Sequence, residues 1–297
     1  MQKIFRLFIL YLTTLGVSSC ASPVIFTAIG DTPYHESDSE LELLSETLNA
    51  IAQKDIPFVV HVGDIFRGWT PCSPDLYEFR GRVFQRSPIP FLVTIGDNEF
   101  NDCFDPEEAQ GHFRKIILGS PPLKQSVMGF NSDSKPVHVT RQAEMIENAT
   151  WSFNNIDFIM FVLPDLPGNY PLSTEKISTI LDANTNFINR GFKNAKHNKR
   201  DAVVLVTHSE PALCRVQGCE QFNSIIEKEV KQFENPVLLI NGSNHKRTFV
   251  DGGYQGISTW WHLRPGNTPE AHWPEISFSH KTKRFSVKWM TGPAGKE

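Results

Sequence analysis

Short apolar runs alternate with amphipathic stretches along most of the chain. Six of the runs have the length of a strand, and several are rich in β-branched residues or phenylalanine, which is typical of buried strands. Strands that alternate with helices indicate a layered α/β fold. The six predicted strands cover residues 24–29, 58–62, 91–95, 156–163, 202–207 and 236–240.

Two amphipathic helices are predicted between these strands. The first begins after Ser37, Asp38 or Ser39, any of which can cap its N-terminus. The second begins near Ser173. Each places an apolar stripe at helical spacing that should cover a sheet. The stripes are Leu41, Leu44, Leu48 and Ile51 in the first helix, and Ile177, Ile180, Leu181, Phe187 and Ile188 in the second.

The remaining segments predict hairpins and one surface insertion. Residues 151–163 have the pattern of a hairpin that turns near Asn154 and Asn155. The stretch 119–145 is rich in Pro, Ser and Lys and is interpreted as an insertion into a single domain. After residue 240 the helical periodicity ends, and the short strands expected there should complete a second sheet. They cover residues 248–250, 257–261, 276–279 and 285–289.

Residues 1–19 have the pattern of a targeting signal. Lys3 and Arg6 precede an apolar segment, 4–15, that is too short to span a bilayer. The segment ends in Val17-Ser18-Ser19-Cys20, which resembles the bacterial lipobox. We therefore expect cleavage before Cys20 and lipidation of this cysteine, with an ordinary secretory signal cut near Ser19 or Ala21 as the alternative. In both cases the mature domain, 20–297, is exported, to the bacterial periplasm or to the membrane through lipidated Cys20.

The other four cysteines predict two disulfides, because an even number in an oxidising compartment favours pairing. Cys214 and Cys219 form the local pair, which leaves Cys72 and Cys103. Free thiols or a metal site are the alternatives, but the chain has no Cys-x-x-Cys spacing.

The charge balance does not indicate a nucleic-acid partner. The net charge is −4, and the loss of two basic residues with the signal makes the mature chain more acidic. The basic stretch near residues 193–200 follows a predicted helix and is interpreted as a solvated helix end.

Polar side chains follow five of the six predicted strands. Because the carboxyl ends of strands in an open α/β sheet form a ligand crevice, these side chains should converge. Crowded carboxylates repel one another, so the cluster implies divalent cations, and its oxygen and nitrogen ligands suit Zn, Mn, Fe or Mg. The segments are Gly30-Asp31, Gly63-Asp64, Gly96-Asp97-Asn98-Glu99, His208 and Gly242-Ser243-Asn244-His245.

This order of motifs, over residues 30–250, resembles that of the calcineurin-like metallophosphoesterases, which include the purple acid phosphatases. The resemblance implies a four-layer α/β/β/α sandwich of two mixed β-sheets flanked by helices. It implies two divalent metal ions and the hydrolysis of phosphate mono- or diesters. Asp31 and His245 would hold the first ion, Asp64 would bridge both, and Asp97 and His208 would hold the second.

Several positions depart from the family's pattern. Pro33 and Ser243 stand where many members have a histidine ligand, and Asp97 replaces an asparagine. Asn98 replaces a histidine that assists catalysis. His35 could replace the ligand missing at position 33, but we favour its interpretation as a histidine of a surface loop. Each ion then keeps three protein ligands, which together with water suffice for a catalytic site.

Further roles follow from the same alignment of motifs. Asn98 and Glu99 belong to the catalytic set, with Glu99 orienting its neighbours, and Arg67 and Asn98 are expected to bind phosphate. His61 lies inside a predicted strand and is interpreted as buried structure. The substitutions at 33, 98 and 243 motivate a second hypothesis, a catalytically impaired envelope lipoprotein that keeps the fold as a binding module.

Overall fold

A computed structural model describes residues 22–35, 37–119, 125–128, 137–266 and 272–291. The predicted targeting segment and Cys20 lie outside these residues, as does part of the predicted insertion. None of the helices in the described parts of the chain combines the length and apolar character needed to cross a membrane.

The strands form two mixed sheets. The five-stranded sheet has the order β13-β12-β1-β2-β3, in which β1, β2 and β3 are parallel. The eight-stranded sheet has the order β10-β11-β9-β8-β7-β6-β5-β4, in which β7, β8, β9 and β11 are parallel. In the first sheet the strands are β1 (Val24–Ile29), β2 (Val59–His61), β3 (Phe91–Val93), β12 (His272–Ser279) and β13 (Arg284–Thr291). In the second they are β4 (Gln125–Met128), β5 (Val137–Arg141), β6 (Ala149–Phe153), β7 (Ile156–Met160), β8 (Ala202–Thr207), β9 (Val237–Asn241), β10 (Thr248–Val250) and β11 (Trp260–Arg264).

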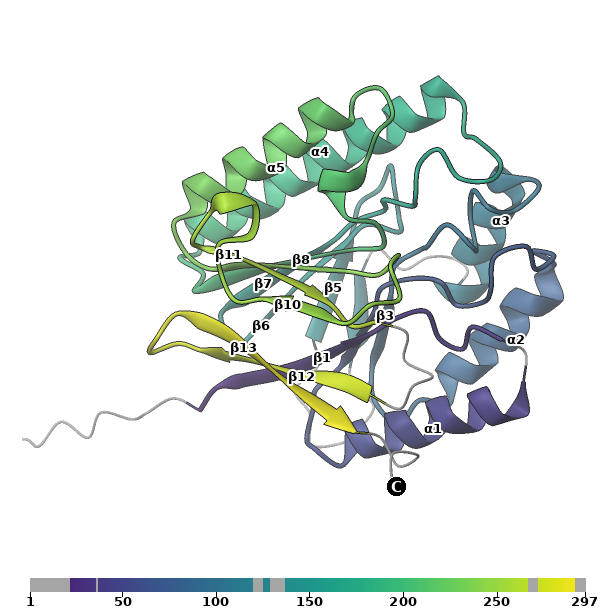
Figure 1. Cartoon of the computed structure of the whole chain (residues 1–297), viewed down its shortest axis with the longest axis horizontal. Coiled ribbons are helices and arrows are strands. Elements are labelled where there is room, and N and C mark those ends of the chain that lie inside the picture. The colour runs from purple at the N-terminus through teal and green to yellow at the C-terminus, as the bar shows by residue number, and fades with distance from the viewer. Residues whose placement is uncertain (1–21, 36, 120–124, 129–136, 267–271, 292–297) are drawn as a thin grey trace, which may run out of the picture.

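Helices cover the outer side of each sheet (Figure 1). α4 and α5 lie over the eight-stranded sheet, and α1 and α2 lie on the opposite side of the molecule, so the chain has the predicted four layers. The α-helices are α1 (Asp38–Ala52), α2 (Pro74–Gln85), α3 (Pro106–His112), which continues as a π-helical turn over Phe113–Ile117, α4 (Thr174–His197) and α5 (Cys219–Phe233).

A continuous apolar layer joins the two sheets. Phe26 of β1 and Phe158 of β7 are fully buried and meet edge to face at 5.1 Å between ring centroids. Val60, Val204 and further residues of both sheets belong to the same buried cluster. Side chains from the inner faces of two sheets form the core of a sandwich in this way.

Local signals in the sequence correspond to observed caps and turns. The Ser37 hydroxyl accepts a hydrogen bond from the Glu40 N–H, and that of Ser173 accepts one from the Lys176 N–H. Asn154 and Asn155 have φ values of 45° and 64° and form the two-residue loop between β6 and β7. Such a loop requires positive φ, which asparagine tolerates.

The region after residue 240 differs from the expectation. Its strands do not complete one sheet: β10 and β11 join the eight-stranded sheet, whereas β12 and β13 return to the five-stranded sheet, where β12 pairs with β1. β12 pairs with β1 over residues 24–27, and Ile276 and Phe278 of β12 belong to the buried cluster between the two sheets. The strand expected over 257–261 instead begins at Trp260, after a 3-10 turn at Tyr254–Gly256.

The structure also describes part of the predicted insertion and both predicted disulfides. Part of the stretch 119–145 forms β4 and β5, which pair at the edge of the eight-stranded sheet. Disulfides join Cys72 to Cys103 and Cys214 to Cys219, the pairing expected from the sequence.

Candidate metal centre

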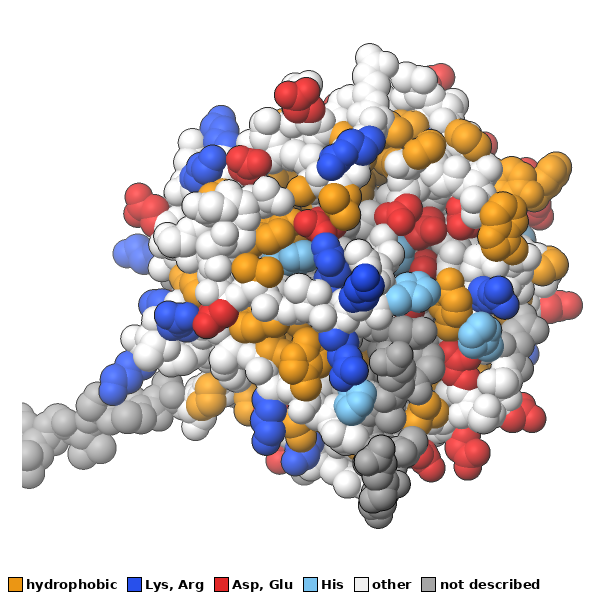
Figure 2. Space-filling view, viewed as in Figure 1, with side chains coloured by type: hydrophobic (Ala, Val, Ile, Leu, Met, Phe, Trp, Pro, Cys, Tyr) orange, Lys and Arg blue, Asp and Glu red, His pale blue; other side chains and the backbone are white. Residues whose placement is uncertain are grey.

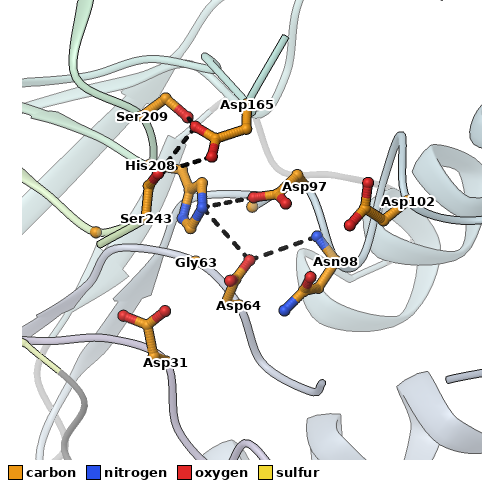
Figure 3. A network of polar contacts seen from close by, with 12 residues as sticks. Asp31, Gly63, Asp64, Asp97, Asn98, Asp102, Asp165, His208, Ser209 and Ser243 are labelled. Carbon is orange, nitrogen blue, oxygen red and sulfur yellow. Dashed lines mark hydrogen bonds and ion pairs between the residues drawn. The ribbon is translucent and has the colours of Figure 1, made fainter. Parts of the chain in front are cut away.

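The carboxyl ends of five strands deliver the five predicted ligands to one place. β1, β2 and β3 of the smaller sheet lead into Asp31, Asp64 and Asp97, whereas β8 and β9 of the larger sheet lead into His208 and His245. Figure 3 shows the three aspartates and His208 facing a common centre. The smaller sheet thus supplies the carboxylates, and the larger sheet supplies the imidazoles.

The five side chains form two groups that share one member. Ligand atoms of Asp31, Asp64 and His245 lie within 4.8 Å of one another, and so do those of Asp64, Asp97 and His208. Asp64 belongs to both groups. The arrangement matches the ligand sets that the family resemblance implies.

Tight turns bring these side chains together. Asp31, Asp64 and His245 have φ values of 50°, 58° and 46°, a region that residues other than glycine rarely adopt. Such strain persists where the surrounding structure requires it, commonly at functional sites. A Cβ on Gly96 would lie 2.3 Å from Asp64 Oδ1, so only glycine allows this carboxylate to approach the next loop so closely.

His208 is fixed in the tautomer that suits a ligand. Its Nδ1 lies 2.7 Å from the Val62 carbonyl oxygen and therefore donates a hydrogen bond to it. Nε2 then faces Asp97 Oδ1 at 2.7 Å and Asp64 Oδ1 at 3.5 Å. A metal-binding histidine typically donates its other N–H to a carbonyl or carboxylate in this way.

The centre brings three carboxylates to two imidazoles, which shifts the pKa of several of these groups. Burial raises the pKa of Asp64 well above its usual range. The His208 imidazole opposes this shift, whereas the Asp97 and Asp31 carboxylates add to it. Burial opposes the charged form of His208, but the Asp64 and Asp97 carboxylates raise the pKa of this imidazole well above its usual range. Divalent cations would compensate the buried carboxylates directly.

Several ligand atoms are buried without a hydrogen bond. Both carboxylate oxygens of Asp31, Oδ1 of Asp97 and Nε2 of His208 are in this state. His245 Nε2 lies 3.2 Å from Asp31 Oδ1. Since buried polar atoms nearly always have a partner, close approach without hydrogen-bond geometry fits groups that share a cation. The residues present therefore fit a pair of divalent ions.

Glu99 holds the loops that carry the aspartates. Its Oε1 accepts hydrogen bonds from the N–H groups of Asp64 at 3.1 Å and Gly96 at 2.6 Å, and its Oε2 accepts one from Ile65 at 3.2 Å. The side chain is fully buried, and burial raises the pKa of Glu99 to about 7. Glu99 is thus placed to orient its neighbours rather than to touch a substrate.

Asn98 is held through both its side chain and its backbone. Its Nδ2 donates to the Phe66 carbonyl oxygen at 2.9 Å, and its backbone N–H lies 3.4 Å from Asp64 Oδ1. The Tyr34 hydroxyl also bonds to the Asn98 side chain. The amide therefore fixes the turn that follows β2, and it borders the cleft described next.

A cleft with a volume of about 340 Å³ opens in front of the centre. Arg67 lies on its wall and is exposed. The wall also contains residues that the sequence analysis did not identify. The lining residues are Tyr34, Asp64, Arg67, Gly68, Trp69, Asp97, Asn98, Asp102, Asp165, Ser243 and His245.

Ser243, where many members of the resembled family have a histidine, is hydrogen-bonded to Asp165. The Ser243 hydroxyl donates to Asp165, whose carboxylate oxygens lie 2.9 and 2.8 Å away, and the Ser209 hydroxyl bonds to the same carboxylate (Figure 3). Asp165 lies two residues after the predicted strand 156–163, so a rule that examined every strand end, with or without glycine, would have found it. Tyr34 meets His245 edge to face at 5.1 Å, but no spacing in the sequence indicates this contact.

His61 is buried and His35 is exposed, as expected from the sequence. His61 is fully buried and accepts a hydrogen bond from the Gly63 N–H, so its Nε2 donates to the Thr32 carbonyl oxygen at 2.7 Å. Burial lowers the pKa of His61 to about 4. His35 is exposed and belongs to neither group of potential ligands among the described residues.

Comparison with known proteins extends the resemblance to the fold. No known family profile matches the chain, and no curated protein sequence does. The structure is similar to a dimetal phosphatase from Danio rerio, with a TM-score of 0.55 and 12% identity over 91% of this chain and 100% of that one. It is also similar to a purple acid phosphatase from yellow lupin (Lupinus luteus) seeds, with a TM-score of 0.54 and 12% identity over 93% of this chain and 52% of that one.

The chain thus spans about half the length of the lupin protein and the whole of the zebrafish one. At these identities the similarity concerns the fold. The predicted sandwich is confirmed, and the protein has the fold of the dimetal phosphatases and related metallophosphoesterases.

Proposed function

We propose that this protein is an exported, metal-dependent phosphoesterase that hydrolyses phosphate mono- or diesters. The observation that carries the proposal is the pair of three-residue groups that share Asp64. They lie at the carboxyl ends of strands from both sheets, next to an open cleft. The fold is that of dimetal phosphatases, which makes a phosphoester the substrate class that fits best.

Each ion would have three protein ligands. Asp31, Asp64 and His245 would hold one divalent cation, and Asp64, Asp97 and His208 the other. When bound, such a pair supplies positive charge for the phosphoryl oxygens and activates water. Zn, Mn, Fe and Mg all accept oxygen and nitrogen ligands of this kind.

The chain's own residues would bind and orient the ester. The exposed Arg67 guanidinium on the cleft wall can donate two parallel hydrogen bonds to phosphoryl oxygens. Asn98 holds the turn that carries Arg67 through the Phe66 carbonyl oxygen. Glu99 holds the backbone on both sides of Asp64, so the bridging carboxylate is fixed before any substrate arrives.

Removal of the shared ligand tests the proposal. We expect the purified chain to contain two divalent ions by elemental analysis and to hydrolyse nitrophenyl phosphate mono- or diesters. Asp64→Asn should lose both properties, since Asp64 serves both groups, whereas the exposed Asp182→Asn should keep them. A folded wild-type protein with neither metal nor turnover would overturn the proposal.

That outcome would support the second candidate, an envelope lipoprotein that uses the fold as a binding module. Pro33 and Ser243 provide no imidazole, and the Ser243 hydroxyl is occupied by Asp165, which are the observations in its favour. Circular dichroism of the metal-free protein would establish that it is folded and not merely denatured.

A further inference from the structure

Trp69 is exposed at the cleft. Its side chain is one of three large hydrophobic ones that are strongly exposed among the described residues, at 74%. The others are Phe104 at 86% and Leu213 at 54%, and neither lines the cleft. Figure 2 shows hydrophobic side chains at the surface beside acidic ones, on the side where Figure 1 places α3. A large ring in water next to a substrate cleft is a candidate contact for the substrate.

The backbone at Trp69 is strained. Its φ is 68°, in the left-handed region, which is a genuine outlier for a bulky residue. The residue lies in a turn closed by a 3.3 Å hydrogen bond from the Thr70 N–H to the Arg67 carbonyl oxygen. Retained strain of this kind concentrates at ligand-binding positions.

The turn is anchored on both sides. Before it, the Asn98 amide donates to the Phe66 carbonyl oxygen, and after it Cys72 is bonded to Cys103. In its middle, a Cβ on Gly68 would lie 2.8 Å from Asn98 Oδ1, so the turn packs directly on Asn98. Trp69 is therefore presented by a fixed segment, which reduces the entropy lost when a ligand packs on its ring.

We propose that Trp69 stacks on a planar aromatic ring in the leaving group of the phosphoester. The inference rests on the proposed function and deepens it, because it names aryl or nucleoside phosphoesters as the substrate class. Arg67, two residues earlier in the same turn, binds the phosphoryl group, so one segment recognises both ends of the ester. Any planar ring can stack in this way, whereas an alkyl group offers no π-face.

Equilibrium binding of inert analogues tests this separately from turnover. The full, metal-loaded chain is titrated calorimetrically with phenylphosphonate and with methylphosphonate. We expect phenylphosphonate to bind more tightly. Trp69→Ala should weaken its binding by about 5- to 150-fold, the range for loss of one stacked aromatic side chain. Methylphosphonate affinity should change little, and Trp69→Phe should restore most of the preference.

Phe104→Ala is the matched control, since it removes an exposed aromatic ring outside the cleft, and it should leave both affinities unchanged. The ratio of kcat/KM for adenosine 5′-monophosphate over ribose 5-phosphate identifies the source of the ring. A ratio that falls in Trp69→Ala indicates a nucleoside. If the wild type has a ratio near one but still binds phenylphosphonate more tightly than methylphosphonate, the ring belongs to a simple aryl group.

Two results would overturn the inference, and they differ in what they imply for the enzyme. If both phosphonates bind equally in a metal-dependent manner and Trp69→Ala weakens neither, the stacking role is wrong and the phosphoesterase proposal stands. If neither phosphonate binds in a metal-dependent manner, both proposals fail. Thermal unfolding of each variant establishes that the exposed substitutions leave the fold intact.

Discussion

A single carboxylate, that of Glu99, holds the backbone of two loops at the centre. It accepts hydrogen bonds from three backbone N–H groups and is fully buried. A glutamine would offer one acceptor oxygen and would turn an N–H₂ group toward backbone donors. A buried donor left without a partner costs about 1–3 kcal/mol, and a lost partner of this type typically reduces metal affinity about 10- to 100-fold.

We therefore expect Glu99→Gln to lower the free energy of unfolding by about 1–3 kcal/mol and the metal affinity by about 10- to 100-fold. Urea denaturation and competition with a chelating dye measure them. Glu78→Gln is the control, because Glu78 forms an exposed ion pair with Arg82, and such pairs contribute about 0–1 kcal/mol. An unchanged metal affinity in Glu99→Gln would contradict the orienting role.

The substitution of histidine by Asn98 affects the leaving group. General acid assistance is typically worth about 10²- to 10⁴-fold, and an asparagine amide cannot supply a proton. Turnover should thus depend steeply on the acidity of the leaving alcohol, with aryl esters hydrolysed faster than simple alkyl esters. A series of phosphoesters of graded leaving-group pKa, including a fluorinated alkyl ester matched to phenol, separates this effect from stacking on Trp69. Equal rates along the series would refute it.

At the residue scale, the five predicted ligands were recognisable because each follows a strand end in a fixed order. Asp165 also follows a predicted strand, by two residues, but no spacing indicates Tyr34, which reaches the site through a loop. The exposure of Trp69 was likewise invisible, because it depends on a turn held by Asn98 and a disulfide distant in sequence. The sequence thus predicted the ligands better than the wall of the cleft.

Strand–turn elements depend on glycine where loops of neighbouring strands touch. A methyl group on Gly96 would meet Asp64 Oδ1 at 2.3 Å, whereas one on Gly111 of α3 would meet nothing within 4 Å. We expect Gly96→Ala to displace the shared carboxylate and abolish binding of at least one ion, measured by elemental analysis. Gly111→Ala should leave metal content unchanged and stabilise the helix by up to about 1 kcal/mol. Two bound ions in Gly96→Ala would count against the proposed bridging position.

Elements with plain periodicity were predicted and others were missed for identifiable reasons. α1 and α4 have clear stripes and serine caps. α2 was missed because Arg80 and Gly81 lie on its buried face and interrupt the apolar pattern. α5 buries Phe222, Ile226, Val230 and Phe233, a helical spacing that is visible in the sequence. The sheet assignment of β12 could not be predicted, because short alternating strands fit the inner face of either sheet.

At the scale of the whole molecule, the candidate centre lies between the two sheets. Ions held by aspartates of one sheet and histidines of the other would bind the native state and not the unfolded chain. At a free metal concentration 100 times the dissociation constant, one such site adds about 2.7 kcal/mol. We expect chelation to lower the unfolding temperature of the wild type by several degrees and that of Asp64→Asn by little, measured by differential scanning fluorimetry. Equal shifts in both would contradict the site.

Export and lipidation remain predictions from residues 1–20, which lie outside the described part of the chain. Cys20→Ser should move the protein from the membrane fraction to the soluble fraction of a bacterial host and abolish incorporation of labelled palmitate. A membrane fraction that is unchanged by Cys20→Ser would contradict the anchor.

The direction of β1 has a consequence for how such an anchored molecule would face its surroundings. β1 begins at Val24, four positions after Cys20, and runs toward Asp31 over about 20 Å. A tether at Cys20 would hold the amino ends of the parallel strands against the lipid headgroups and turn the mouth of the cleft away from the bilayer. Diffusible small molecules would then enter freely, and the esters of the host membrane itself would be out of reach.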